Sequence, residues 1–294
     1  MSYPPTHFVN PADNVEHTHT IILLHGRSST AEEFATDLFA LQSSEASGSL
    51  RSHFPAVRWV FPDAGLRWCT AFKENRSAWF DTFSLDRMNN RQDLQVSGLR
   101  DGIQLVQTIV EKEVVMLNGR ADKVVLGGFS QGSAVALWSI FTGAVMTKGC
   151  LGGFLGLSAW MPFTTEAKEA VNHPEKSTDR RFQDLRNAFS DILGVESFGF
   201  VEMIEKYSGF PASLGHGTDD TVVSVKNTHD VSQVFSAIGA SVEVGEYVGA
   251  DREGHWIKPP EQVDHIIRFL ECVLKTGKER RIMHEGIQSP EPRA

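Results

Sequence analysis

The segment that most constrains the fold of this chain is 124–138. An apolar run leads into a Gly-x-Ser-x-Gly pattern, in which Ser130 stands between Gly128 and Gly132, and a helix-favouring run follows. This order predicts a strand, a sharp turn and a helix, with the serine at the apex of the turn. Glycine is needed on both sides because a Cβ atom two residues from the serine would collide with the neighbouring strand or helix. We therefore interpret Ser130 as a nucleophile rather than as a turn serine with only a capping role.

Apolar segments and segments of helical periodicity alternate along the rest of the chain. Short apolar or alternating runs predict strands at 18–24, 57–61, 124–128, 152–158, 211–214 and 241–247. Apolar residues spaced three and four apart predict helices at 31–41, 96–114, 131–145, 231–238 and 259–274. Strands that alternate with helices favour an α/β fold, in which a mostly parallel central sheet is covered by helices on both faces.

The pattern predicts a single domain over 18–276. Residues 1–17 are polar and contain proline, and we interpret them as an N-terminal arm, whereas the charged residues 277–294 are predicted to be a disordered tail. The turn-rich stretch 63–90 shows no clear period and is expected to be a long functional loop. Residues 164–210 are charged and polar, and we expect an enlarged, exposed excursion that is helical in part.

Charge and cysteine content narrow the class of protein. The formal net charge of −9 argues against nucleic acid or an anionic membrane as the main partner. The three cysteines are widely spaced, so free thiols in a reducing compartment are expected, with no metal site and no cofactor. Neither a signal peptide nor a run long enough to span a bilayer is apparent. We therefore expect a cytoplasmic protein without stable membrane insertion.

A serine hydroxyl needs a base within hydrogen-bond reach, because it is a poor nucleophile at neutral pH. In folds of this class the partners follow the serine in the order acid, then histidine, each on a loop after a strand. His255 lies between the last predicted strand and the last helix, and is the candidate base. Asp219 and Asp220 both follow the strand at 211–214, and only one of them can point at the base. The acid would hold the imidazole in the tautomer that accepts the serine proton.

Two other histidines compete for the role of base. His25 ends the first predicted strand and His216 lies beside the two aspartates, each followed by glycine. We interpret both as structural imidazoles that pin a loop.

Two backbone N–H groups are needed to stabilise the oxyanion of a tetrahedral intermediate. One is expected from Gln131, which follows the nucleophile at a helix N-terminus, where the helix dipole helps. The other is expected from the loop after the first strand, and Arg27 is our candidate; the alternative for this loop is a plain strand-to-helix turn.

Aromatic and apolar residues gather at three predicted loops on the side of the sheet where Ser130 lies. They predict an apolar acyl channel and a set of substrate-binding side chains, which are Trp79, Phe80, Trp160, Met161 and Trp256. Any single aromatic residue is more often core than pocket, so the prediction depends on the three loops together.

These motifs together resemble one known family, the acyl-protein thioesterase, phospholipase and carboxylesterase group of α/β-hydrolases. The resemblance spans about residues 18–276. The matching segments are Leu-Leu-His-Gly at 23–26, Phe-Pro at 61–62, Ala-Trp-Phe-Asp at 78–81, Leu-Gly-Gly-Phe-Ser-Gln-Gly-Ser at 126–133, Leu-Ser-Ala-Trp-Met-Pro at 157–162, His-Gly-Thr-Asp-Asp-Thr-Val-Val at 216–223 and Gly-His at 254–255.

The resemblance implies an α/β-hydrolase fold and an apolar acyl tunnel. It also selects Asp220 over Asp219 as the acid, because the family's acid is the fifth residue of the segment that begins at His216, and it supports Arg27 as an oxyanion donor. The chain departs from the family in three respects. The segment 164–210 is enlarged, and Arg27 stands where the family often has an apolar residue. The residues after His255, Trp-Ile-Lys at 256–258, are larger than those that usually follow this histidine in the family.

The sequence therefore predicts a serine hydrolase that cleaves carboxylic esters or thioesters through an acyl-enzyme, with Ser130, His255 and Asp220 as its catalytic triad. The expected substrate is a small-molecule ester or an acylated protein. One alternative is an acyltransferase or a specialised-metabolite tailoring enzyme with the same triad. A non-catalytic binding protein on the same fold is a third hypothesis, although such proteins usually lack a triad residue. A homodimer formed through apolar surface near the pocket is a further hypothesis.

Overall fold

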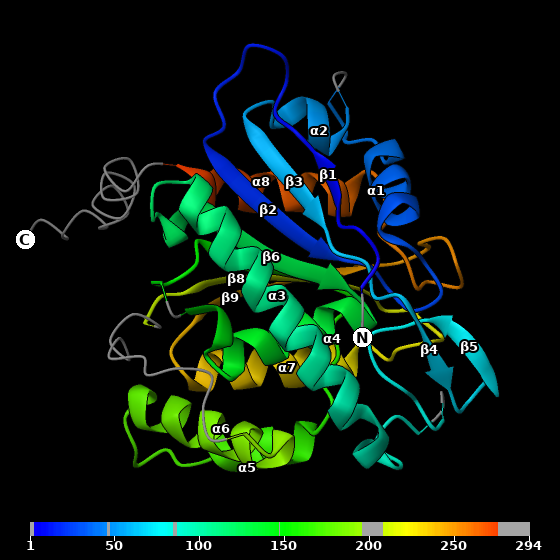
Figure 1. The fold of residues 1–294 in the computed structure, drawn as a ribbon, viewed down its shortest axis with the longest axis vertical. Helices are drawn as coiled ribbons and strands as arrows, with labels where there is room; N and C mark the ends of the chain where they lie inside the picture. The colour runs from blue at the N-terminus through cyan, green and yellow to red at the C-terminus, as the bar shows by residue number, and fades with distance from the viewer. Residues whose placement is uncertain (1–2, 46–47, 85–86, 147, 196–207, 276–294) are drawn as a thin grey trace, which may run out of the picture.

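A seven-stranded sheet runs through the middle of the molecule in the order β1-β3-β2-β6-β7-β8-β9 (Figure 1). The computed structural model describes residues 3–45, 48–84, 87–146, 148–195 and 208–275. Neighbouring strands of this sheet are parallel except β1 and β3, which are antiparallel. The predicted α/β fold with a mostly parallel sheet is confirmed.

The strands of the main sheet are β1 (His7–Val9), β2 (His19–Leu24), β3 (Val57–Phe61), β6 (Val124–Phe129), β7 (Gly153–Leu157), β8 (Pro211–Gly217) and β9 (Ser241–Tyr247), and a separate hairpin consists of β4 (Leu66–Cys69) and β5 (Glu74–Ser77). The α-helices are α1 (Ala31–Ala40), α2 (Leu50–His53), α3 (Val96–Met116), α4 (Gln131–Phe141), α5 (Thr164–Val171), α6 (Thr178–Leu193), α7 (Lys226–Ala237) and α8 (Glu261–Leu274). Short 3-10 helices span Gln92–Gln95, Ala121–Lys123 and Ala144–Met146.

Helices cover both faces of the sheet, and a hydrophobic core fills the space on each side. Successive side chains of a strand point to opposite faces, so neighbours in sequence belong to different cores. Ile22 and Leu126 pack in the core with α3, α4 and α7, whereas Ile21 and Val125 pack in the core with α1 and α8. The central strand β6 and residues 21–24 of β2 are apolar throughout because both of their faces are buried.

The N-terminal arm predicted over 1–17 is partly wrong. His7–Val9 form β1, which pairs antiparallel with β3 and extends the sheet by one edge strand. The sheet therefore begins inside the segment that the sequence assigned to an arm. The predicted tail at 277–294 lies outside the described residues.

The stretch 63–90 is not a plain loop, because β4 and β5 form a hairpin within it. Along β4 the pattern is inverted: Leu66 and Trp68 are exposed, whereas Arg67 and Cys69 are buried. Arg67 is buried because its guanidinium donates to the carbonyl of Ala78 and pairs with an aspartate of α3. Hydrophobic periodicity does not predict this strand, because its arginine is buried and two of its apolar residues are exposed.

The enlarged segment at 164–210 is helical where it is described, through α5 and α6. These helices form an outer layer beyond α4 and α7 (Figure 1). The contact is apolar: Phe182 and Phe189 are buried, and the ring of Phe189 stacks on that of Trp138 with centroids 3.9 Å apart. The described part of this segment therefore enlarges the core rather than forming an exposed excursion.

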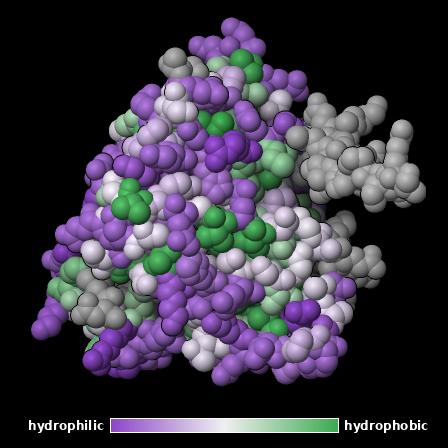
Figure 2. All heavy atoms as spheres, turned by 180° about the vertical axis from the view of Figure 1, so that it is seen from behind, coloured by the Kyte–Doolittle hydropathy of each residue, from purple (hydrophilic) through white to green (hydrophobic). Residues whose placement is uncertain are grey.

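The carboxyl ends of β2, β6, β8 and β9 meet at one edge of the sheet, and the loops that follow them carry the predicted site residues. Parallel α/β sheets place their ligand sites at this edge. The face shown in Figure 2 is mostly hydrophilic, with apolar residues in separate small areas. Among the described residues, no helix is long and apolar enough to cross a membrane.

Candidate active site

Ser130 occupies the strained turn between β6 and α4. Its backbone φ of 51° and ψ of −117° lie in a region that residues with a side chain rarely adopt. The turn is tight: a Cβ atom on Gly132 would lie 2.3 Å from the carbonyl oxygen of Leu24, and one on Gly128 would lie 2.6 Å from the backbone of Gly132. Glycine at both positions thus permits the close approach that brings Ser130 to the edge of the sheet.

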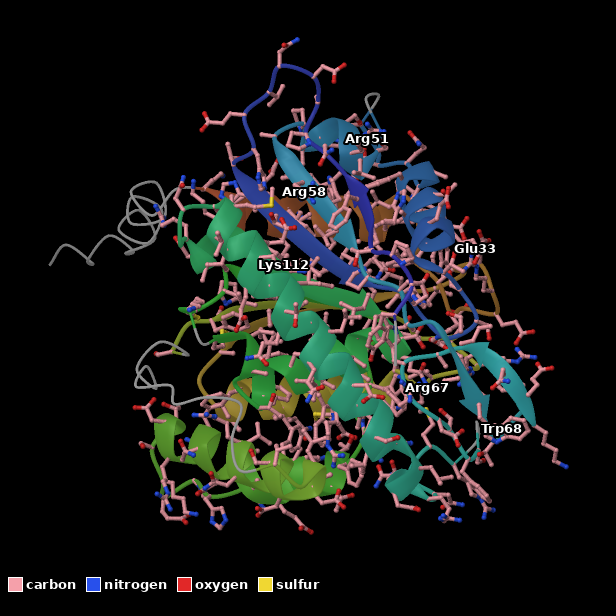
Figure 3. All side chains as sticks on the ribbon, viewed as in Figure 1. Glu33, Arg51, Arg58, Arg67, Trp68 and Lys112 are labelled. Carbon is pink, nitrogen blue, oxygen red and sulfur yellow. The ribbon has the colours of Figure 1, made fainter. Side chains whose placement is uncertain are left out.

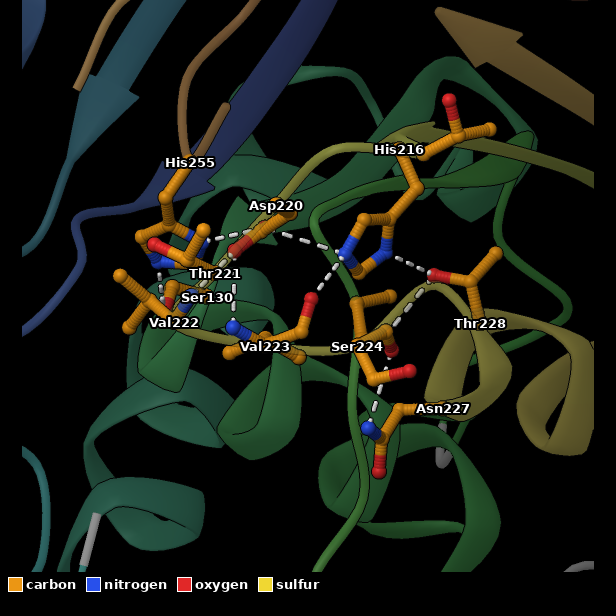
Figure 4. A network of polar contacts seen from close by, with 12 residues as sticks. Ser130, His216, Asp220, Thr221, Val222, Val223, Ser224, Asn227, Thr228 and His255 are labelled. Carbon is orange, nitrogen blue, oxygen red and sulfur yellow. Dashed lines mark hydrogen bonds and ion pairs between the residues drawn. The ribbon is translucent and has the colours of Figure 1, made fainter. Parts of the chain in front are cut away.

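Ser130, His255 and Asp220 form a hydrogen-bonded chain (Figure 4). The Oγ atom of Ser130 lies 3.0 Å from Nε2 of His255, and Nδ1 of His255 lies 2.6 Å from Oδ2 of Asp220. An ionised carboxylate only accepts hydrogen bonds, so Nδ1–H donates to Asp220 and the lone pair of Nε2 faces the serine hydroxyl. Asp219 instead accepts from the N–H of Gly249 at 2.9 Å, which ties together the loops after β8 and β9.

The carboxylate of Asp220 accepts four hydrogen bonds. Oδ1 accepts from the N–H groups of Val222 and Val223, each at 2.8 Å, and Oδ2 accepts from His255 and, at 3.1 Å, from Nε2 of His216. Burial by itself would raise the pKa of Asp220, but the hydrogen bonds from His216, His255 and the backbone outweigh it and hold the pKa well below its usual range. Asp220 is therefore an ionised, rigidly held acceptor at neutral pH.

The two competing histidines are fully buried and hydrogen-bonded away from Ser130. His25 accepts from the N–H of Ala64 through Nε2 at 3.0 Å, and its Nδ1 lies 2.7 Å from the carbonyl of Gly26. Burial lowers the pKa of His25, which favours the neutral ring that this pairing requires. His216 lies 2.7 Å from the carbonyl of Val223, in addition to its contact with the acid. The contribution of His216 to the acid was not anticipated from the sequence.

Two backbone N–H groups flank the serine. Gln131 is the first residue of α4, so its N–H has no acceptor within the helix. No hydrogen-bond acceptor for the N–H of Arg27 occurs among the described residues. The Arg27 loop is fixed because the next residue, Ser28, has a φ of 65° and donates its N–H to the carbonyl of Ser77 at 2.7 Å.

Trp79 and Phe80 hold these two loops together and do not line the substrate cavity. The side-chain amide of Gln131 accepts from the N–H of Trp79 and donates to the carbonyl of Phe80, both at 2.8 Å. The indole N–H of Trp79 donates to the carbonyl of His25, also at 2.8 Å. Both aromatic side chains are fully buried. Their predicted substrate-binding role is therefore wrong, because the segment turns its rings into the core and its backbone toward Gln131.

Of the other predicted pocket residues, one lines a cavity beside Ser130 and two do not. Trp160 lines a cavity beside Ser130, as expected. Met161 is buried in the core, and Trp256 packs behind Phe129 with ring centroids 4.9 Å apart, so neither lines the two cavities that contain Ser130. The predicted place of Met161 and Trp256 in the pocket wall is wrong, because Met161 packs in the core and Trp256 packs against the rings of Phe34 and Phe129.

Two cavities adjoin Ser130. The larger one, of about 370 Å³, is lined by Arg27, Phe129, Ser130, Val222, Arg252, Glu253 and His255. The smaller one, of about 20 Å³, is lined by Arg27, Met88, Ser130, Gln131, Trp160, Val222 and Val223. Neither has the dimensions of a long acyl channel. No group of three or more His, Cys, Asp or Glu side chains suited to a metal ion occurs in the described part of the chain.

A sheet of this topology, with a serine on a strained strand-to-helix turn, defines an α/β-hydrolase. Among solved structures, the maize (Zea mays) acyl-protein thioesterase 2 is similar in fold, with a TM-score of 0.64 and 22% identity over 93% of this chain and 100% of that one. Arabidopsis thaliana SOBER1 is also similar in fold, with a TM-score of 0.59 and 21% identity over 88% of this chain and 100% of that one.

A family model described as phospholipase/carboxylesterase matches residues 6–180, more than half of the sequence, and the chain belongs to this family. It is similar to the acyl-protein thioesterase 1 of Neurospora crassa, with 28% identity over 86% of each chain. It is also similar to the acyl-protein thioesterase 1 of Cryptococcus neoformans, with 27% identity over 71% of this chain and 69% of the relative. The chain is accordingly an ester or thioester hydrolase, and the predicted family is confirmed.

Proposed function

We propose that this enzyme hydrolyses carboxylic esters or thioesters through an acyl-enzyme on Ser130. The proposal is supported by the hydrogen-bonded chain from Ser130 through His255 to Asp220. In the first half-reaction, Oγ of Ser130 attacks the substrate carbonyl while Nε2 of His255 takes the hydroxyl proton. The N–H groups of Gln131 and Arg27 stabilise the negative charge that forms on the carbonyl oxygen.

The leaving group departs with the proton that His255 holds, as an alcohol from an ester or as a thiol from a thioester. Water then attacks the acyl-enzyme while His255 takes one of its protons, and the free acid leaves as the proton returns to Ser130. Asp220 fixes the ring orientation and stabilises the imidazolium in both halves. A small ester or an acylated protein supplies the acyl group; the relatives named acyl-protein thioesterase motivate the second class of substrate.

The matched pair Asp220→Asn and Asp219→Asn tests the assignment of the acid. Both changes remove one carboxylate from adjacent residues, but only Asp220 contacts His255. We expect Asp220→Asn to lower kcat for a p-nitrophenyl ester by about 10⁴-fold, the loss found when the acid of such a triad becomes an amide. Asp219→Asn should retain most of the activity, because it weakens only a loop contact. Equal losses in the two variants would reject Asp220 as the acid.

Transfer of the acyl group to an alcohol or amine would proceed from the same acyl-enzyme. Product analysis with and without added acceptors separates the two outcomes. Hydrolysis predicts free acid as the main product in every case, and an ester or amide product that dominates at low acceptor concentration would favour the transferase.

A further inference from the structure

Arg27 places a cation in the wall of the active site. Its side chain lines both cavities that contain Ser130. The guanidinium lies over the ring of Phe72, at 5.1 Å from the centroid, in the turn between β4 and β5. No carboxylate among the described residues lies within ion-pairing distance of this guanidinium. The residue that faces the nucleophile thus carries a charge without a partner.

The surroundings of Arg27 do not favour an unpaired charge. Burial lowers the pKa of Arg27, and the neighbouring cation of Arg76 acts in the same direction. The guanidinium of Arg76 lies over the same ring of Phe72, at 3.9 Å from its centroid. Arg76 also pairs with Glu74. A charge removed from water is unfavourable unless an opposite charge or hydrogen bonds replace the water. An anion bound in the cavity would supply that opposite charge.

The larger cavity has two other charged residues besides His255, namely Arg252 and Glu253. Arg252 pairs with Asp37, with Nη2 and Oδ2 2.6 Å apart, and its guanidinium stacks on an aromatic ring. The carboxylate of Glu253 accepts from the hydroxyl of Thr221 at 3.1 Å. Among the described residues, Arg27 is therefore the arginine of this cavity without an ion-pair partner. The carboxylate of Glu253 lines the same cavity but does not pair with Arg27.

The two cavities differ in which part of a substrate they can hold. His255 must protonate the leaving group, so the leaving group lies on the side of the imidazole. His255 lines the larger cavity and not the smaller one. The smaller cavity is lined by Arg27, Ser130 and Gln131 on one hand and by Met88, Trp160 and two valines on the other. These four apolar side chains suit a short apolar acyl group. The leaving group accordingly occupies the larger cavity, where Arg27 and Arg252 are the cations.

We propose that Arg27 forms an anion subsite for the leaving group. The preferred substrates are then esters or thioesters whose alcohol or thiol part carries a carboxylate, or a similar anion, a few bonds from the scissile linkage. Arg27 would hold the carbonyl oxygen with its backbone N–H and the anion with its guanidinium, which has the planar fork that matches a carboxylate. This inference rests on the proposed function, because it assigns the leaving-group side from the role of His255.

A pair of thioesters that differ only in charge tests the subsite. The two substrates are 3-(acetylthio)propionate and its neutral primary amide, and release of the thiol gives kcat/KM for each. The quantity compared among variants is the ratio of the anionic to the neutral substrate, so that differences in intrinsic reactivity cancel. Arg27→Met keeps the backbone N–H and most of the side-chain stem but removes the guanidinium.

We expect Arg27→Met to lower this ratio about tenfold or more, the effect of losing a charge-assisted hydrogen bond in a partly buried site. Arg27→Lys should give an intermediate ratio, because it keeps the charge without the fork. Arg51→Met is the matched control: Arg51 is exposed on α2, at the end of the molecule away from the β4–β5 hairpin (Figure 3), and its loss removes the same charge from the protein. A ratio in Arg27→Met equal to that of wild type and Arg51→Met would overturn the proposal.

Binding to the Ser130→Ala variant tests the subsite without turnover. Calorimetry should show tighter binding of 3-(acetylthio)propionate than of its amide, and the additional change Arg27→Met should abolish the preference. Equal affinities of the two compounds for Ser130→Ala would overturn the subsite. If wild type hydrolysed neither thioester, the proposed function would fail for these substrates, and the binding comparison would still decide whether Arg27 holds an anion.

Discussion

Replacing Gln131 with glutamate tests the hydrogen bonds that join α4 to the Trp79–Phe80 segment. The side chain of Gln131 is 1% exposed and bridges the N–H of Trp79 and the carbonyl of Phe80. Gln131→Glu keeps the shape and the acceptor for Trp79. It replaces the NH₂ donor with an oxygen that faces the carbonyl of Phe80, so the new group fits only as the protonated acid, whose O–H donates to that carbonyl. The pKa of the introduced carboxyl group should therefore be raised in the folded protein.

The cost of this substitution depends on pH. Keeping a glutamic acid protonated at pH 7 costs up to about 3.7 kcal/mol, at ~1.36 kcal/mol for each unit above an ordinary pKa of about 4.3. At pH 5 the same cost is about 1 kcal/mol. A raised folded-state pKa stabilises the protein below the pKa of the unfolded chain, and that stabilisation is lost as the pH rises. The variant should thus be much less stable than wild type at pH 7 and close to it at pH 5.

Urea denaturation of wild type, Gln131→Glu and Gln104→Glu at both pH values measures this difference. Gln104 is exposed on α3, so its replacement adds the same charge without burial and should change the free energy of unfolding by less than about 0.5 kcal/mol. The reasoning would be refuted if the destabilisation by Gln131→Glu were the same at pH 5 and pH 7, or no larger than that of the control.

Three further predictions concern the site. Because the pKa of Asp220 is low in the folded protein, its ionised form stabilises the fold above about pH 4, and the advantage of wild type over Asp220→Asn in urea denaturation should shrink as the pH falls below that value. A constant difference from pH 7 to pH 3 would contradict this. Gly132→Ala should impair catalysis and lower the free energy of unfolding by ~1–3 kcal/mol, because the new Cβ would lie 2.3 Å from the carbonyl oxygen of Leu24. An unchanged melting temperature would argue against the tight turn. Trp79→Phe leaves the buried carbonyl of His25 without its donor, so the free energy of unfolding, measured by denaturation, should fall by about 1–3 kcal/mol. Steady-state kinetics should show a larger effect on kcat than on KM.

The strand, turn and helix around Ser130 could be predicted from the sequence because their signal is local. Gly128 and Gly132 are separated from Ser130 by one residue each, and the apolar run and the helix that flank them have periods that are visible in the sequence. The relation between His255 and Asp220 follows from topology, since the loops after parallel strands meet at one edge of the sheet. The hydrogen bond from His216 to the acid had no such signal, because it depends on how the loop after β8 folds back.

The predictions that failed concern side-chain direction and edge pairing. Trp79 and Phe80 occur at the right place in the chain, but only the packed structure shows that their rings face the core and their backbone faces Gln131. Arg67 is buried in β4 by hydrogen bonds to distant residues, which reverses the expected alternation. The three residues of β1 are too few to show a period, and their pairing with β3 is a tertiary contact.

Covalent labelling shows whether Ser130 is an activated nucleophile. A fluorophosphonate reacts with a serine only where a base and an oxyanion site activate it, and mass spectrometry of the digested protein locates the adduct. We expect one adduct, on Ser130, in wild type and none in Ser130→Ala. An adduct on another residue of wild type, or equal labelling of the two proteins, would contradict this expectation.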